Sequence, residues 1–119
     1  GMQLSSKMRF IAAQFTALLT NELWRRSAQH ANKMARLLAS ELESVQGITL
    51  TQPVEANEVF AILPRHIVPK LQERWPFHIW NESTTEARLI ASFDTTEEDV
   101  ADFAQLVREA IGTKERQWT

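Results

Sequence analysis

The chain has 119 residues, with 13 basic and 15 acidic side chains, a formal net charge of -2 and no cysteine. This length is typical of one domain and is enough to bury a core without disulfides or metals. An apolar content of 44% excludes extended disorder, and the near-neutral charge argues against a nucleic-acid partner. The absence of cysteine excludes thiol catalysis and a disulfide scaffold, and it fits a cytoplasmic protein.

The sequence contains no apolar region typical of a signal peptide. No apolar run approaches the roughly 20 residues that a membrane-spanning helix needs, so we expect no membrane partner. Gly1 before Met2 is typical of a purification-tag remnant, and we expect the natural chain to begin at Met2.

Two amphipathic helices are predicted in the first part of the chain. The first begins after the N-cap candidates Ser5 and Ser6 and carries apolar residues at three- and four-residue steps as far as Leu19. Thr20-Asn21 interrupts the pattern. The second helix has one stripe, made of Trp24, Ala28, Ala31, Ala35, Leu38, Leu42 and Val45.

The alanines of the second stripe leave two interpretations open. The stripe is either a coiled-coil seam or a face packed closely against another element, and the three central alanines favour close packing. Gly47 suits the end of this helix, because glycine tolerates the left-handed backbone conformation there.

The rest of the chain alternates between strand and helix patterns. Residues 48–51 alternate like a half-buried strand, whereas 58–63 indicate a more fully buried strand. A short helix is predicted over 67–74, with Pro69 in its first turn. Two further strands are expected at 77–80 and 88–93.

The last helix has a clear start signal. Two overlapping capping boxes precede it, Thr95 with Glu98 and Thr96 with Asp99. Its apolar positions run from Val100 to Ile111, and it is predicted to stop at Gly112.

The resulting order, α-α-β-β-α-β-β-α, predicts an α+β two-layer sandwich with a small antiparallel or mixed sheet covered by helices. Because there is no repeat or linker, residues 1–119 are interpreted as one domain. Residues 5–111 are its folded part and 112–119 a polar tail.

No catalytic or metal site can be built from the residues alone. His30, His66 and His78 lie in three different elements without metal-ligand spacing, so each is interpreted as a surface or packing residue. The acidic run 97–99 is explained by the partial positive charge of a helix N-terminus. No catalytic residue and no metal ligand is therefore assigned.

Two arginines have a possible binding role. On its strand, Arg88 shares a face with Ile90, Ser92 and Asp94. In one interpretation, the guanidinium of Arg88 is solvated or forms an ion pair with Asp94 or Glu86. In the other, it binds a ligand carboxylate through two parallel hydrogen bonds. Arg9 is either on a solvated helix face or in contact with an anion.

Four stretches resemble bacterial low-specificity threonine aldolases, in order and in spacing. This family belongs to the pyridoxal-phosphate β-eliminating lyases of the aspartate-aminotransferase-like fold. The stretches are Ser6-Lys7-Met8-Arg9-Phe10 continuing to Gln14, His30 to Ala35, Glu55 to Ala61, and Phe77 to Trp80 followed by Arg88 to Thr95. Together they cover most of residues 5–111 and are similar to the C-terminal small domain of these enzymes.

The resemblance implies a reaction and two site residues. The family cleaves β-hydroxy-α-amino acids such as threonine to glycine and an aldehyde, with pyridoxal phosphate as electron sink. By motif position, Arg88 would bind the substrate α-carboxylate, and Arg9, in a looser match, would contact the cofactor phosphate in the intact enzyme. Trp80 is expected to be packing or site wall.

The family's large domain has no counterpart in this sequence. The lysine that holds the cofactor, the aspartate at the pyridine nitrogen and the ring-stacking histidine all belong to that domain. None of Lys7, Lys33, Lys70 and Lys114 matches the family's lysine motif. We therefore expect no cofactor in this chain and no catalysis by it alone, whether it is a truncated gene product or an excised piece.

A stand-alone module is the rival interpretation. A domain separated from a larger neighbour leaves apolar surface uncovered, so a homo-oligomer through exposed apolar helix faces is expected. The candidate faces are that of Phe10, Phe15 and Leu19 and the alanine stripe. Alternatively, Arg88 binds amino acids or other carboxylates as a regulatory site.

Overall fold

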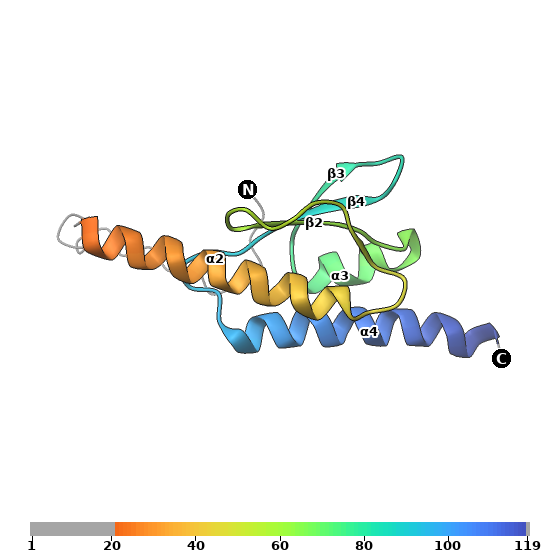
Figure 1. The fold of residues 1–119 in the computed structure, drawn as a ribbon. Helices are drawn as coiled ribbons and strands as arrows, with labels where there is room; N and C mark the ends of the chain where they lie inside the picture. The colour runs from red at the N-terminus through yellow and green to blue at the C-terminus, as the bar shows by residue number, and fades with distance from the viewer. Residues whose placement is uncertain (1–20, 119) are drawn as a thin grey trace.

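The computed structural model describes the backbone of residues 21–118 and the side chains of residues 22–112 (Figure 1). The helix expected before Thr20 lies outside the described residues. From there on, the predicted order of elements is confirmed. The elements are α2 (Asn21–Glu43), β1 (Thr49–Leu50), β2 (Glu58–Ile62), the 3-10 turn η1 (Arg65–Ile67), α3 (Val68–Arg74), β3 (His78–Asn81), β4 (Glu86–Ile90) and α4 (Glu97–Trp118).

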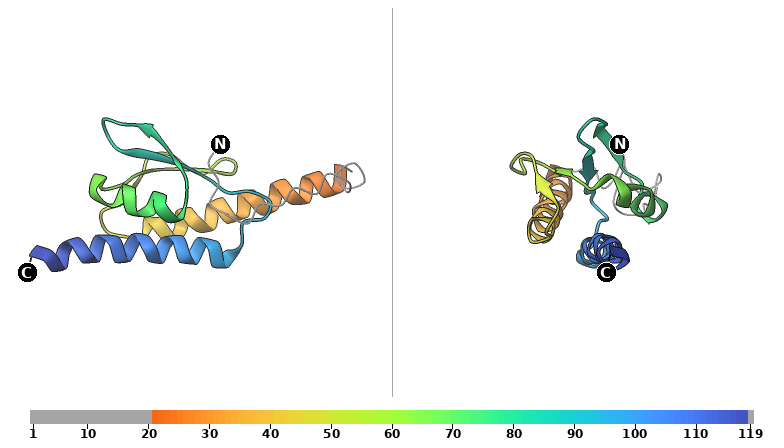
Figure 2. Two further views of the ribbon diagram at one scale, coloured as in Figure 1. Left: turned by 180° about the vertical axis from the view of Figure 1, so that it is seen from behind. Right: turned by 90° about the vertical axis from the view of Figure 1, so that its right-hand side faces the viewer.

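The four strands form one antiparallel sheet in the order β1-β2-β4-β3. The central pair runs from Glu58 opposite Ile90 to Ile62 opposite Glu86. After β2 the chain passes through η1 and α3 and returns as β3, on the far side of β4. The long helices α2 and α4 lie side by side on one side of the sheet (Figures 1 and 2). The α+β class is confirmed, and of the two predicted sheet types the antiparallel one is observed.

The sheet has one buried face and one half-exposed face. In β2, Val59 and Ala61 are buried, whereas the alternate residues Glu58, Phe60 and Ile62 are only partly covered. As predicted, the strand at 58–63 is more fully buried than the one at 48–51, in which Thr49 is exposed and Leu50 is half-buried. The described helices pack against the inner face, and side chains on a strand point alternately to the two faces.

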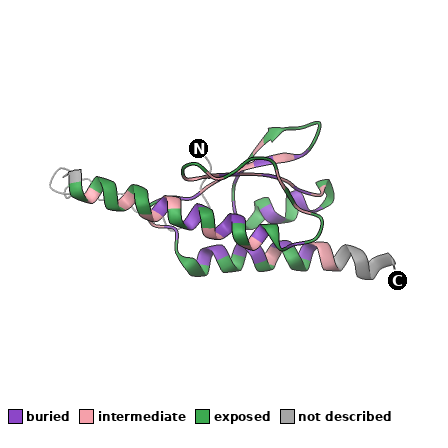
Figure 3. Cartoon of the chain, in the orientation of Figure 1, coloured by how far each residue is buried: buried purple, intermediate pink, exposed green. Residues whose placement is uncertain are grey.

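Most of the α2 stripe packs inside the chain. Ala31, Ala35, Leu38 and Leu42 are all buried, and α2 packs against both α4 and the sheet. Figure 3 shows buried positions along α2. This confirms close packing against another element, so that part of the stripe is no surface for a second chain. Towards the start of α2, Trp24 is 66% exposed.

The two glycines at predicted helix ends behave differently. Gly47 has a φ of 101°, the left-handed conformation expected of it, in the turn that follows α2. Gly112, in contrast, lies inside α4, which continues to Trp118, so the predicted stop of the helix at Gly112 was wrong. One glycine costs a helix about 1 kcal/mol, and helix formers such as Lys114, Glu115 and Arg116 follow it.

Only one of the two capping boxes forms. The Asp99 amide donates to Thr96 Oγ1 at 3.0 Å, and the Thr96 amide donates to Asp99 Oδ2 at 2.9 Å. Thr95 has a different role, because its buried Oγ1 accepts a hydrogen bond from the Ser92 amide at 2.9 Å. Thr96 is therefore the N-cap of α4.

We expect the substitution Thr96→Ala to lower the free energy of unfolding by about 1 kcal/mol, because it leaves a helix amide without its acceptor. Urea denaturation followed by circular dichroism measures the change. Glu98→Ala is the control, since Glu98 is exposed at the start of α4, and its effect should stay within about 0.5 kcal/mol. Equal losses in both variants would contradict the assignment of the cap.

Candidate functional site

Arg88 lies at the centre of the half-exposed sheet face. It is the middle residue of β4, its side chain is 31% exposed, and its Cα is paired with Phe60 on β2 and with His78 on β3. Because Ala87 and Leu89 point into the core, the period of two puts Arg88 on the opposite face. The site is therefore carried by the central strands of the sheet.

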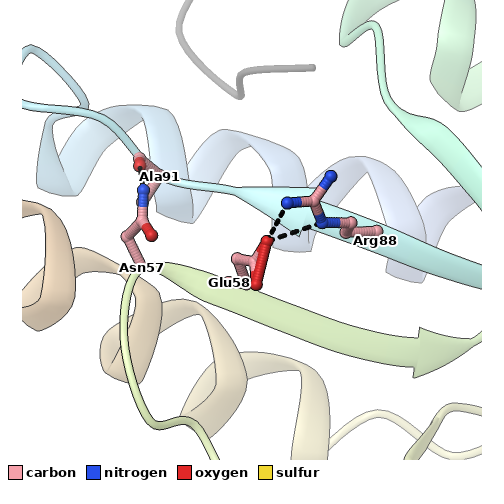
Figure 4. Close-up of polar contacts among 4 residues, drawn as sticks. All are labelled: Asn57, Glu58, Arg88 and Ala91. Carbon is pink, nitrogen blue, oxygen red and sulfur yellow. Dashed lines mark hydrogen bonds and ion pairs between the residues drawn. The ribbon is translucent and has the colours of Figure 1, made fainter. Parts of the chain in front are cut away.

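The guanidinium of Arg88 forms an ion pair with Glu58. Its Nε donates to Glu58 Oε1 at 2.6 Å, and its Nη2 donates to the same oxygen (Figure 4). Glu58 lies opposite Ile90, two residues along β2 from Phe60, so it is the diagonal neighbour of Arg88. Diagonal pairs on one face are within reach of long side chains.

The acidic partners expected from local sequence are engaged elsewhere. Glu86 accepts a hydrogen bond from Thr51 Oγ1 at 2.6 Å, and Asp94 accepts one from Ser92 Oγ at 2.6 Å. The prediction that Arg88 pairs with Asp94 or Glu86 was wrong, because the guanidinium pairs with Glu58 of the neighbouring strand. Asp94 also lies beyond the end of β4 at Ile90.

Two aromatic rings complete the surroundings of Arg88. The Arg88 Cζ lies 5.7 Å from the ring centroid of Trp80, within the range of a cation–π contact. The rings of Trp80 and Phe60 meet edge to face at 5.7 Å, across β4, which separates their strands. Trp80 thus packs between Arg88 and Phe60, and its role as a wall of a substrate site stays a prediction.

At one end of the β2–β4 pair, Asn57 forms two hydrogen bonds with Ala91, one through its side chain and one through its backbone. The Asn57 side-chain amide donates to the Ala91 carbonyl at 2.9 Å, and the Ala91 amide donates to the Asn57 carbonyl at 2.9 Å (Figure 4). These bonds hold Glu58 and Arg88 in register. No role could be assigned to Asn57 or Glu58 from the sequence, because only the strand register brings them close to Arg88.

The three histidines lie in separate elements, as expected. His30 Nε2 on α2 is 2.6 Å from the Thr95 carbonyl, so it connects α2 to the loop before α4. His66 is exposed in η1, and His78 is exposed on β3. Among the described side chains, residues 22–112, no three acidic or histidine groups gather as metal ligands would.

The described lysines do not fit a pyridoxal-phosphate site. Lys33 on α2 and Lys70 on α3 are exposed, on helices that pack against the inner face of the sheet, whereas Arg88 lies on the outer face. A shallow hollow of about 560 Å³ between α2 and the loop after β1 contains no lysine and shares no residue with the Arg88 site. Arg9 lies outside the described residues, and its role stays a prediction.

Membrane insertion has no support in the described helices. From Asn21 to Trp118, none combines the length and the apolar character required to cross a bilayer.

Comparisons with known proteins agree with the resemblance seen in the sequence. No protein-family model matches the chain. The chain is 41% identical to the low specificity L-threonine aldolase of Pseudomonas aeruginosa, over 92% of its own length and 32% of that protein. It is 39% identical to the enzyme of the same name from a Pseudomonas species, over 89% of the chain and 31% of that protein.

A solved structure shares the fold. The threonine aldolase of Leishmania major superimposes with a TM-score of 0.67 and 28% identity, over 81% of this chain and 29% of that one. The chain therefore spans about a third of the length of each relative. Sequence and fold together show that this chain is homologous to the C-terminal portion of the low-specificity L-threonine aldolases.

Proposed function

We propose that the chain is the substrate-carboxylate-binding part of a pyridoxal-phosphate-dependent lyase. In the intact enzyme, that lyase would cleave threonine-type β-hydroxy-α-amino acids to glycine and an aldehyde. One observation carries the proposal for this chain: a half-exposed arginine, Arg88, on the sheet face that the described helices leave open. The homology to threonine aldolases supports the substrate class.

Arg88 would act by fixing the substrate in one orientation. A guanidinium binds a planar carboxylate through two parallel, charge-assisted hydrogen bonds, and it therefore sets the direction as well as the position of the bound molecule. Such positioning is a large part of catalysis, since a misplacement of about 1 Å can cost a hundredfold in rate. Pyridoxal phosphate, bound by residues of the intact enzyme, would supply the electron sink.

The chain alone is proposed to be inactive, because its described residues provide no lysine at the Arg88 site. We expect purified chain, mixed with pyridoxal phosphate and L-threonine, to release acetaldehyde no faster than the free cofactor does. A coupled aldehyde assay measures the rate, with a full-length threonine aldolase as positive control. Enzyme-like turnover, together with a visible absorbance band of bound cofactor, would refute the claim that the chain is incomplete.

Self-association is a second proposal, and exposed aromatic side chains favour it. Trp24, Trp80 and Phe93 are 66%, 58% and 51% exposed. Large exposed apolar groups often mark a protein–protein interface. We therefore expect sedimentation velocity to show a homo-oligomer whose fraction increases with protein concentration. Trp24→Gln should weaken it if α2 takes part. A monomer at every concentration would contradict the proposal.

The proposed location is the cytoplasm, with no nucleic-acid or membrane partner. The absence of cysteine and the near-neutral net charge support it.

A further inference from the structure

We infer that Glu58 is a positioning residue for Arg88: it holds one edge of the guanidinium and leaves the other edge free for the carboxylate of an amino-acid ligand. The inference rests on the proposed function, because it assumes that Arg88 binds such a carboxylate. Glu58 would stay hydrogen-bonded to Arg88 both before and after the ligand binds.

The hydrogen bonds to Glu58 show which edge of the Arg88 guanidinium is occupied. A guanidinium has five N–H donors and can present two different pairs to a carboxylate, Nε with Nη2 or Nη1 with Nη2. Glu58 Oε1 accepts from both Nε and Nη2 of Arg88, so the Nε edge is occupied by a single oxygen. The Nη1 nitrogen points away from Glu58, and no described residue is hydrogen-bonded to it (Figure 4).

The second neighbour restricts the guanidinium from another side. Glu58 is the diagonal neighbour of Arg88 on β2. On β3, Trp80 lies two residues after His78, which faces Arg88. The Trp80 ring contacts the guanidinium at 5.7 Å and is itself held by Phe60. An arginine held from two strands has less rotational freedom to lose when a ligand binds, which favours binding.

The exposure of the pair keeps the free edge accessible. The side chains of Arg88 and Glu58 are 31% and 30% exposed, so they are neither buried in the core nor fully solvated. A ligand carboxylate can therefore reach Nη1 and Nη2 without displacing Glu58. The expected complex has two carboxylates on one arginine, one from the chain and one from the ligand.

The test is nuclear magnetic resonance of the arginine side chains in the whole chain, labelled with ¹⁵N-arginine. Arg88→Lys assigns the Arg88 signals by removing them. On addition of L-threonine, we expect a saturable shift of the Arg88 Nη signals, while the Nε signal keeps the position that marks its bond to Glu58. L-threoninamide lacks the carboxylate and should produce no such shift.

Two variants separate the hydrogen bond that Glu58 makes to Arg88 from the negative charge of Glu58. Glu58→Gln keeps an acceptor oxygen at the same reach, whereas Glu58→Ala removes it. We expect threonine to bind Glu58→Ala about two- to tenfold more weakly than Glu58→Gln, because the ligand must then order the arginine itself. Glu41→Ala is the matched control. It breaks the Glu41–Arg108 pair of similar exposure between the helices and should leave threonine binding unchanged.

Other outcomes would overturn the inference in distinguishable ways. If threonine shifts the Arg88 signals but the Nε signal loses its Glu58-bound position, Glu58 is a competitor of the ligand, and carboxylate binding by Arg88 stands. The same holds if Glu58→Ala binds threonine at least as tightly as Glu58→Gln. If no Arg88 signal responds to threonine in any variant, the inference fails for this chain. The proposed function is then judged separately, by the activity of an enzyme that carries this segment.

Discussion

Replacing Arg88 with alanine is expected to lower kcat/KM for L-threonine by roughly 30- to 4000-fold in a threonine aldolase that carries this segment as its C-terminal part. In the intact enzyme the pair of Arg88 with the substrate carboxylate would be desolvated, and removing one partner of such a hydrogen-bonded charge pair costs about 2–5 kcal/mol, which corresponds to that range of rates. The segment would be joined to the preceding two thirds of a low-specificity L-threonine aldolase, and glycine and acetaldehyde formation would be measured at varied threonine concentration.

Arg108→Ala is the matched control for this substitution. Arg108 is also a partly exposed, ion-paired arginine, bound to Glu41 at 3.0 Å, but it lies on α4 and not on the sheet face. We expect it to retain the kcat/KM of the parent chimera. Full activity of the Arg88→Ala enzyme would contradict the carboxylate-binding role, whereas an equal loss in both variants would point to a general defect of the domain.

The largest effect on stability is expected from Phe103→Ala. Phe103 on α4 is fully buried, and its ring meets the rings of Trp75 and Phe77 edge to face at 6.4 and 6.3 Å. Loss of a buried phenylalanine side chain costs about 3–5 kcal/mol through lost transfer energy and the cavity left behind. A domain is stable by only about 5–15 kcal/mol in total, so this variant should be close to unfolding.

Urea denaturation followed by tryptophan fluorescence measures this effect, since Trp75 lies beside the cavity that would form. Phe93→Ala serves as control, because Phe93 is 51% exposed and should change the free energy of unfolding by no more than about 0.5 kcal/mol. Comparable losses in the two variants would show that the core is not centred on Phe103.

The helices and the N-cap of α4 could be predicted because their signals are local. The α2 stripe repeats every three or four residues, and its buried members Ala31 to Leu42 follow that period. Thr96 and Asp99 interact at a separation of three residues, so both halves of the capping box are visible in one short stretch.

The surroundings of Arg88 could be predicted only in part, because they depend on how separate strands pair. Arg88 itself followed from the resemblance, but Glu58 is 30 residues away in the chain. The two meet only because β2 and β4 are neighbours with Phe60 opposite Arg88. A pattern within one strand carries no information on that register, so the local acidic residues Glu86 and Asp94 were the only partners that could be considered.

The alternation of β4 connects the stability of the domain to its binding site. Leu89 is fully buried and Arg88 is half exposed, on adjacent positions of one strand. A shift of β4 by one residue would turn the arginine into the core and the leucine outward, at a prohibitive cost. The burial of Leu89 therefore fixes the face of the sheet on which Arg88 lies, and the register that sets Leu89 opposite Val59 places Arg88 diagonally to Glu58.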